Sequence, residues 1–200
     1  MTQNRNENWL NSFMDSGFAV EDHFASQAEL KSFNEEFLHL QKSGRFHRAG
    51  VGRGNNHQVY DQLRRDEVAW VEPHGIMKEK LERVRQQLNE SAFLGLWDFE
   101  GHFASYAPGG FYRKHLDRFS DSDLRTVSFV LYLNESWDSE WGGELVLHFS
   151  HGPRKILPSP GRLVLFLSAT TWHEVLPAQR ERRSFTGWFR VREVNAIRCS

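Results

Sequence analysis

Cysteine is nearly absent from this sequence. The single one, Cys199, excludes an internal disulfide and a cysteine-rich zinc site, and we interpret it as a free thiol. Long apolar runs are absent too, because no segment reaches the roughly 18 residues of a membrane span. Residues 1–11 are polar and lack the apolar centre of a signal peptide. We therefore expect a soluble, cytoplasmic protein that does not bind a membrane.

An excess of one charge is also missing. The 25 Lys and Arg residues nearly balance the 26 Asp and Glu residues, which gives a net charge of −1 with neutral histidines. Nucleic-acid binders usually carry a basic excess, so we expect no nucleic-acid partner. Aromatic residues are plentiful, with 16 Phe, 7 Trp and 4 Tyr among 200 residues. This composition can form a core, and we predict a single domain over residues 1–200.

Residues 1–92 show mostly helical patterns. Ser26 is an expected helix N-cap, and Glu29 three residues later can complete a capping box. The helix that follows has apolar residues three and four apart and ends near Gly44. A second amphipathic helix is predicted over 76–89, with an apolar stripe of Ile76, Leu81, Val84 and Leu88. The remaining predicted elements are a short helix over 7–14 and strands at 18–20 and 68–71.

The segment 45–67 is rich in arginine, glycine and asparagine and has few apolar residues. Long polar connections inside a compact domain are often lids or binding loops, and we predict a binding loop here. Its Gly-x-Gly pattern does not indicate a phosphate loop, because no strand precedes it and no Lys-Ser/Thr pair follows.

From residue 93 onward the sequence predicts short strands separated by turns rich in glycine, proline and aspartate. The predicted strands cover 95–107, 110–116, 124–134, 143–149, 154–157, 162–168, 172–176 and 182–192. Eight such strands suggest a barrel or jelly roll. We therefore predict an α+β, mainly β fold, in which the helices of 1–92 support a β core over 93–192.

The strand at 125–133 has two different faces. Its large apolar residues are Val127, Phe129, Leu131 and Leu133, whereas Thr126, Ser128, Val130 and Tyr132 are smaller or polar-tipped. Successive side chains of a strand point to opposite faces. We therefore expect the first set to pack against the helices and the second to line a cavity.

The main chemical signal is His115-Leu116-Asp117, with His173 much later in the sequence. Residues two apart on a strand share a face, so the imidazole and the carboxylate can converge. Two histidines and one carboxylate form the facial triad of non-haem Fe(II) oxygenases. A His-x-Asp tripeptide in a chain with ten histidines also arises by chance, and these would then be ordinary strand residues.

Alternation places Arg182, Ser184 and Thr186 on one strand face, which we predict to point inward. A buried arginine requires an anion, and the far end of a metal-chelating dicarboxylate would supply one. Tyr132 could donate a second hydrogen bond to the same carboxylate. The alternative is an exposed arginine paired with a surface acid, as we expect for Arg183.

Several motifs together resemble the 2-oxoglutarate- and Fe(II)-dependent oxygenases, most closely the HIF-type prolyl 4-hydroxylases and their bacterial relatives. These motifs are His115-Leu116-Asp117, Tyr132-Leu133-Asn134, Trp141-Gly142-Gly143-Glu144-Leu145, Trp172-His173-Glu174-Val175 and the run 182–188, together with 63–70 and 106–112 upstream. The resemblance covers about residues 45–192. It implies a double-stranded β-helix, a jelly-roll or cupin-like fold.

The resemblance also implies a set of site residues. It implies His115, Asp117 and His173 as catalytic iron ligands. It places Arg182 and Tyr132 at the far carboxylate of 2-oxoglutarate, Tyr106 and Tyr112 near this cosubstrate, and Thr186 and Val175 in the wall of its pocket. A bulge in the last strand would instead give the anchoring role to Arg183. The segment 45–67 resembles a loop that closes over a peptide substrate.

One residue departs from the family pattern. His102 stands where the family usually has an apolar residue. It could hold a metal ligand in place without binding the metal, make the pocket more polar, or act as a rival metal ligand. Arg125 is expected near the mouth of the pocket, where it could contact substrate or remain a solvated charge.

The resemblance implies that the protein hydroxylates a prolyl residue in a loop of a protein substrate. It would consume Fe(II)-activated O₂ and 2-oxoglutarate, release succinate and CO₂, and use ascorbate as reductant. The bacterial relatives suggest elongation factor Tu as the substrate, and we expect a monomer. The alternatives are a related oxygenase for another residue, a free amino acid or a small molecule, and an inactive β-barrel that binds or senses a ligand.

Overall fold

The computed structural model describes residues 6–50, 60–118 and 124–193. Its helices are α1 (Asn6–Ser16), α2 (Gln27–Lys42) and α3 (Gly75–Ala92). Its strands are β1 (Phe18–Glu21), β2 (His47–Arg48), β3 (Glu67–Val71), β4 (Leu96–Tyr106), β5 (Tyr112–His115), β6 (Arg125–Tyr132), β7 (Leu145–Phe149), β8 (Gly152–Ile156), β9 (Leu163–Leu167), β10 (Trp172–Val175) and β11 (Arg182–Val191). None of the described helices is long and apolar enough to cross a membrane.

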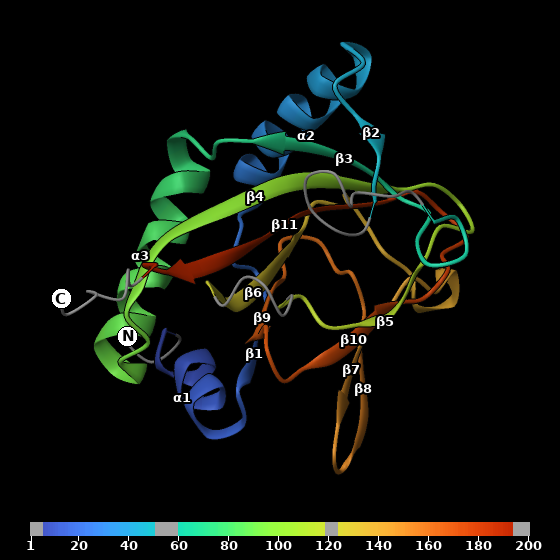
Figure 1. Cartoon of the computed structure of the whole chain (residues 1–200). Helices are drawn as coiled ribbons and strands as arrows, with labels where there is room; N and C mark the ends of the chain where they lie inside the picture. Colours follow the sequence, from blue (N-terminus) through green and yellow to red (C-terminus); the bar gives the residue numbers. More distant parts are fainter. Residues whose placement is uncertain (1–5, 51–59, 119–123, 194–200) are drawn as a thin grey trace, which may run out of the picture.

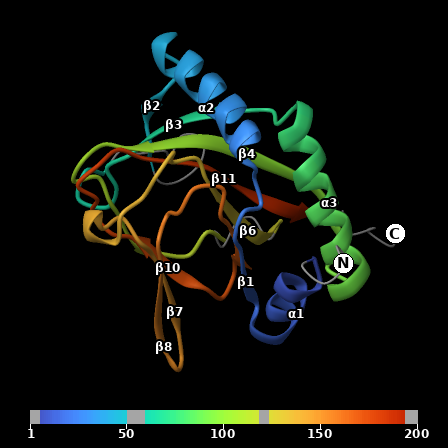
Figure 2. The same cartoon turned by 180° about the vertical axis from the view of Figure 1, so that it is seen from behind.

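The strands form two antiparallel sheets. A seven-stranded sheet has the order β1-β9-β6-β11-β4-β3-β2, and a four-stranded sheet has the order β5-β10-β7-β8. The helices lie on one side of the larger sheet and the smaller sheet lies on the other (Figures 1 and 2). The prediction of a mainly β fold of the double-stranded β-helix type, with helices on one sheet, is therefore confirmed.

The helices begin and pack largely as the sequence predicts. The Ser26 hydroxyl accepts the Glu29 backbone N–H at 3.3 Å, and the Glu29 carboxylate accepts the Ser26 N–H at 2.7 Å, which completes the capping box. In α3 one prediction is wrong. Ile76 is 36% exposed and Met77 is buried in its place, because the helix is rotated so that the face with Met77, Leu81, Val84 and Leu88 packs against the core.

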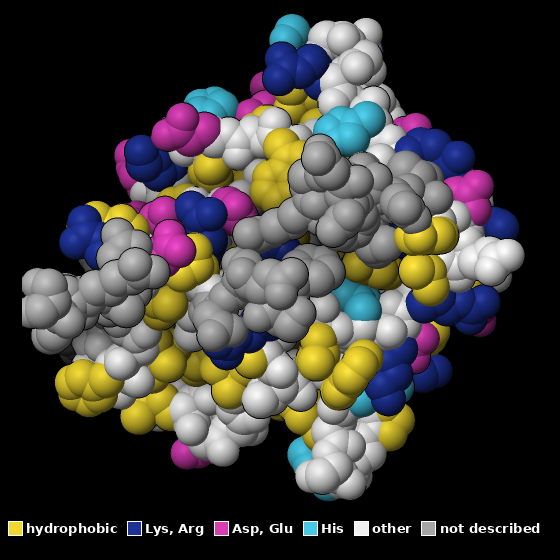
Figure 3. All heavy atoms as spheres, in the orientation of Figure 1, with side chains coloured by type: hydrophobic (Ala, Val, Ile, Leu, Met, Phe, Trp, Pro, Cys, Tyr) yellow, Lys and Arg dark blue, Asp and Glu magenta, His cyan; other side chains and the backbone are white. Residues whose placement is uncertain are grey.

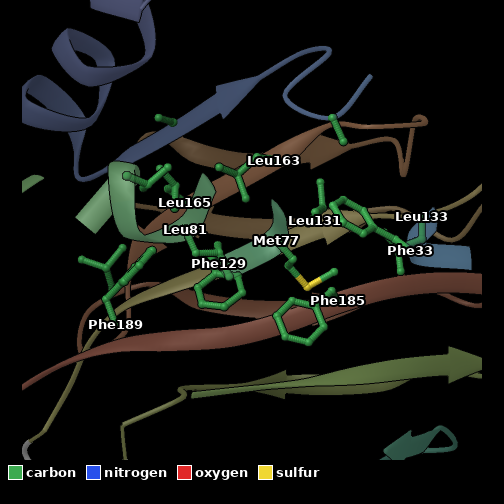
Figure 4. Packing of buried hydrophobic residues seen from close by; sticks show 14 of the residues in the cluster. Phe33, Met77, Leu81, Phe129, Leu131, Leu133, Leu163, Leu165, Phe185 and Phe189 are labelled. Carbon is green, nitrogen blue, oxygen red and sulfur yellow. The ribbon is translucent and has the colours of Figure 1, made fainter. Parts of the chain in front are cut away.

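The main core lies between the helices and the larger sheet. The apolar face of β6 is buried there with residues of the neighbouring strands and of α2 and α3 (Figure 4). Among the packed residues are Phe33, Leu81, Phe129, Leu131, Leu133, Leu165, Phe185 and Phe189. The predicted alternation of β6 is therefore confirmed, and burial of this face anchors the sheet against the helices.

A second cluster lies between the two sheets and includes Ala104, Tyr106, Val130, Tyr132, Leu147, Phe166 and Val175. It comes from the strand faces opposite the main core, and several of its members line a cavity. The short strand β2 within 45–67 was not predicted. Of the predicted binding loop over 45–67, residues 51–59 lie outside the described residues.

Candidate active site

The structure brings the three predicted metal ligands together. His115 at the end of β5 pairs directly with His173 on the neighbouring strand β10, and Asp117 follows β5 by two residues. One donor atom from each residue lies within 4.8 Å of the others. Asp117 Oδ1 is 3.4 Å from His115 Nε2 and 3.5 Å from His173 Nε2. Two imidazoles and one carboxylate oxygen converging in this way fit the facial triad of non-haem iron.

Backbone carbonyls orient both imidazoles. The Nδ1–H group of His115 donates to the Arg113 carbonyl at 2.7 Å, and that of His173 donates to the Thr171 carbonyl at 3.0 Å. With Nδ1 engaged in each ring, Nε2 is the atom that faces Asp117. This arrangement sets the tautomer that a metal-binding histidine requires.

The electrostatics favour an ionised carboxylate. Burial opposes the charge of Asp117, but His173 and His115 outweigh it and hold the pKa of the carboxyl well below its usual value. Burial lowers the pKa of His115, and the adjacent His173 lowers it further. Burial also opposes the charge of His173, yet its pKa is raised because Asp117 lies beside it. Asp117 thus offers an anionic oxygen, and a cation bound there would replace the proton that this carboxylate favours on His173.

Arg182 lies on the cavity side of β11 and is only 2% exposed. Its Nε donates to the Gly143 carbonyl at 3.0 Å, and its Nη2 donates to the Tyr132 hydroxyl at 3.4 Å. Its guanidinium also lies about 5 Å from the ring centres of Tyr106 and Tyr132. Among the described residues no carboxylate pairs with it, so its charge has only neutral partners. A buried cation in this state is suited to an anionic ligand.

Arg183 lies on the opposite face of the same strand. It forms an ion pair with Glu181 at 2.5 Å, and its guanidinium sits 5.0 Å from the ring centre of Phe37 on α2. The register is regular here, with Arg182 opposite Tyr106 and Arg183 opposite Ser105. No bulge exchanges the two arginines, so Arg182 is the one that reaches the cavity.

Gly143, which accepts from Arg182, belongs to a glycine pair with unusual backbone geometry. Gly142 and Gly143 have φ angles of 71° and 74°, which disfavour other residues. A Cβ atom on Gly143 would also lie 2.8 Å from Ala178 Cβ. These glycines allow the chain to turn so that the Gly143 carbonyl meets the guanidinium.

The cavity has a volume of about 350 Å³ and contains both the triad and Arg182 in its walls. Tyr106, Tyr112, Val175 and Thr186, which the resemblance implies around a cosubstrate, also line this cavity. Tyr132 is fully buried and does not line the cavity, although its hydroxyl contacts Arg182. The metal ligands and the anion-binding arginine thus lie in the walls of one cavity, and its volume is in the range usual for small-molecule sites.

Arg64 is a site residue that sequence reasoning missed. Its guanidinium lies 4.1 Å from the ring centre of Tyr112 and forms hydrogen bonds of 2.6 and 2.7 Å with Asp66. The Tyr112 ring stacks on His115 with centres 3.5 Å apart, and burial raises the pKa of Tyr112 to about 12. Two signals were available in the sequence: Arg64 lies within the predicted binding loop and within the motif 63–70.

An aromatic cluster forms another part of the cavity wall. The His102 ring lies 4.7 Å from Trp70 and 5.6 Å from Trp188, measured between ring centres. Arg125 stacks over Trp188 at 3.5 Å and pairs with Glu100 at 2.8 Å, so it is a buried, paired charge. The two tryptophans belong to the motifs quoted above, but sequence reasoning assigned them no role.

His102 is buried and does not belong to the converging metal donors. Burial, together with Arg64 and Arg125, lowers its pKa to about 3, so the imidazole is neutral at physiological pH. Its Nδ1 and the indole Nε1 of Trp188 are buried and have no hydrogen-bond partner within residues 6–50, 60–118 and 124–193. The polar nitrogens of these two neighbouring rings make this wall of the cavity more polar than its aromatic composition suggests.

Comparison with known proteins agrees with this geometry. Residues 101–190 match the sequence pattern of the 2OG-Fe(II) oxygenase superfamily. The crystal structure of a Pseudomonas putida prolyl-4-hydroxylase is 38% identical, covers 93% of this chain and 98% of that one, and superimposes with a TM-score of 0.83. A Trichoplax adhaerens prolyl hydroxylase in complex with a hypoxia-inducible factor peptide is 26% identical, covers 93% and 89% of the two chains, and has a TM-score of 0.76.

Among curated proteins, human Egl nine homolog 1 is 26% identical over 189 residues, which cover 86% of this chain and 43% of the human protein. The mouse and rat proteins give similar matches over 46% and 55% of their lengths. This chain therefore spans about half the length of these relatives.

Proposed function

Because the chain belongs to the 2OG-Fe(II) oxygenase superfamily, we propose that it hydroxylates a prolyl residue of a protein substrate. One observation carries the proposal: a His-Asp-His cluster shares a cavity with a buried arginine that has no carboxylate partner among the described residues. The cluster fits a metal ion and the arginine fits the carboxylate of a cosubstrate. A bound metal and a bound carboxylate would together explain why three metal donors converge here and why the charge of Arg182 has no carboxylate partner among the described residues.

The bound iron and 2-oxoglutarate supply the oxidising chemistry, with succinate and CO₂ as by-products. The protein supplies position and enclosure. His115, Asp117 and His173 would hold the metal, and the Arg182 guanidinium would bind the far carboxylate of 2-oxoglutarate. Tyr132 orients the guanidinium through its hydroxyl.

The remaining predicted residues form the walls of the cosubstrate pocket. Tyr106 and Tyr112 keep their protons, because burial raises the pKa of both phenols. They can therefore donate hydrogen bonds to cosubstrate oxygens. Val175 and Thr186 line the same space. Exclusion of water by these walls would strengthen the charge interactions of the site.

A peptide substrate agrees with the aromatic cluster of Trp70, His102 and Trp188. Trp70 is 44% exposed while the other two rings are buried, so the cluster extends from solvent into the cavity. The ring nitrogens of His102 and Trp188, which have no partner in the part of the chain that the structure describes, suit the carbonyl and amide groups of a peptide. Similarity to a Pseudomonas prolyl-4-hydroxylase and to an enzyme bound to a hypoxia-inducible factor peptide supports a prolyl substrate.

The surface also favours a protein over a nucleic acid. On the face shown in Figure 3, Lys and Arg side chains are interspersed with Asp and Glu side chains and do not form one basic surface. Phosphate-backbone binding would require such a surface. A protein loop of mixed polarity can bind without a basic surface on the enzyme.

The proposal is tested by mass spectrometry. Elongation factor Tu and other candidate proteins are incubated with the enzyme, Fe(II), 2-oxoglutarate and ascorbate, and Asp117→Ala serves as the inactive control. A gain of one oxygen on a proline, dependent on iron and absent with the control, is expected. Oxygen added only to another residue type would refute prolyl specificity. Absence of both product and succinate above background would favour a binding or sensing protein.

A further inference from the structure

The second oxygen of the metal-binding carboxylate has its own partner. Ser128 on β6 donates its hydroxyl proton to Asp117 Oδ2 at 2.7 Å. The other oxygen, Oδ1, is the one that faces both imidazoles at 3.4 and 3.5 Å. The two oxygens of Asp117 thus have separate tasks, one toward the metal position and one toward Ser128.

A second serine supports this hydroxyl. Ser168 Oγ lies 2.9 Å from Ser128 Oγ, and the backbone N–H of Ser168 donates to the Thr126 carbonyl at 3.0 Å. Because Ser128 has a single proton and gives it to Asp117, Ser168 must be the donor to Ser128. The resulting order is Ser168 to Ser128 to Asp117 Oδ2. All three residues are buried, with Ser128 1% and Ser168 0% exposed.

The hydrogen bond between Ser128 and Asp117 connects the two sheets. Ser128 belongs to the seven-stranded sheet, whereas Asp117 follows a strand of the four-stranded sheet. A hydrogen bond to an ionised group in a buried site is stronger than one between neutral groups. Rotation of Asp117 that brought both oxygens to a metal would break this bond and leave the Ser128 hydroxyl unsatisfied.

We propose that Ser128, supported by Ser168, restricts Asp117 to metal binding through one oxygen. A carboxylate can bind a metal through one oxygen or through both, and the second mode occupies an additional coordination position. Facial-triad sites depend on positions left open for other ligands. Ser128 is therefore a positioning residue that preserves the place of the cosubstrate. The inference deepens the proposed function and rests on its metal and cosubstrate site, but not on the identity of the substrate.

The test uses the full chain with Co(II) or Mn(II) and no peptide. Three quantities are measured: the metal dissociation constant by chelator competition, the visible absorption spectrum of the Co(II) form, and the 2-oxoglutarate dissociation constant of the Mn(II) form by calorimetry. The variants are Ser128→Ala, Ser128→Thr and Ser168→Ala. Ser105→Ala is the control, because Ser105 is also a buried strand serine but its hydroxyl donates to Glu181, outside the cavity.

In Ser128→Ala we expect unchanged or tighter metal binding and about tenfold weaker 2-oxoglutarate binding, in line with a lost hydrogen bond to a charged group. The Co(II) bands should weaken and shift as the coordination number rises. Ser128→Thr should restore both properties, Ser168→Ala should give a smaller change, and Ser105→Ala none. If Ser128→Ala does not fold, Ser128→Cys provides a side chain of similar size with a weak donor.

Two results would overturn the inference. One is an unchanged 2-oxoglutarate affinity and Co(II) spectrum in Ser128→Ala or Ser128→Cys. The other is a loss of 2-oxoglutarate affinity that merely follows a loss of metal affinity, which would indicate a general disturbance of the site. Failure of the wild-type protein to bind metal and 2-oxoglutarate would instead refute the proposed function.

Discussion

Replacement of Arg182 is the most direct test of the cosubstrate site. We expect Arg182→Met to weaken 2-oxoglutarate binding while metal binding is retained. Methionine fills much of the same buried volume, so the substitution removes the charged fork without leaving a large cavity. The guanidinium is 2% exposed, and solvent therefore screens its interaction with a bound carboxylate only weakly.

The size of the effect follows from the bonds that are lost. A hydrogen bond to a charged group contributes about 1.5–3 kcal/mol, which corresponds to an affinity change of about 10- to 150-fold. The range applies to the net effect, because burial of the charge also costs free energy. In the free protein, hydrogen bonds to the Gly143 carbonyl and the Tyr132 hydroxyl offset part of the free-energy cost of burying the Arg182 charge.

Calorimetric titration of the Mn(II)-loaded protein with 2-oxoglutarate measures the effect, and Arg183→Met is the matched control. Arg183 pairs with Glu181 and covers Phe37, so its loss should leave cosubstrate affinity within about twofold of the wild type. Thermal unfolding of both variants separates lost binding from lost stability. Equal affinity in Arg182→Met and the wild type, or a larger loss in Arg183→Met, would refute the assignment.

The remaining predictions concern the metal, the aromatic cluster and two structural residues. Asp117→Ala should weaken Mn(II) binding by more than about 100-fold in a chelator-competition assay, and retained affinity would contradict its role as a ligand. His102→Leu should keep or increase the free energy of unfolding in urea, because it removes a buried unpartnered nitrogen; a loss above about 1 kcal/mol would show that His102 has a structural partner. Ser26→Ala should cost about 1 kcal/mol through loss of the helix cap, and an unchanged urea midpoint would show that the capping box is dispensable. Leu81→Ala should cost about 2–5 kcal/mol, since Leu81 is fully buried between α3 and the sheet; a cost below 1 kcal/mol would mean that the core closes around the gap.

Local patterns in the sequence were sufficient to predict the helices and most of the strands. The capping box at Ser26 depends on residues three apart, and the two faces of β6 depend on strict alternation, so neither requires knowledge of distant contacts. The position of β2 could not be predicted, because two exposed residues carry no periodicity and pair only with β3. The choice of Met77 over Ile76 in α3 depends on how the helix is rotated against the sheet.

The chemistry of the site was also visible in the sequence, although its geometry was not. The spacing of His115 and Asp117 places two donors on one strand face, and the resemblance to a family supplied His173 as the third. The pairing of β5 with β10 is what brings His173 to them. Long-range register of this kind is set by the whole sheet and is not contained in any local segment.

The tertiary structure shows which of several chemically similar side chains lies in the cavity and what surrounds it. Arg182 and Arg183 are adjacent, and the regular register of β11 against β4 directs the first into the cavity and the second toward α2. The pKa of His102 is unusually low because the side chain is buried and two arginines, Arg64 and Arg125, act on it. Ser128 gains its partner because two sheets face each other across the site. Sequence thus determined which groups are present and which strand face each occupies, whereas packing determined what each group meets, because contacts between distant segments exist only once the sheets have closed.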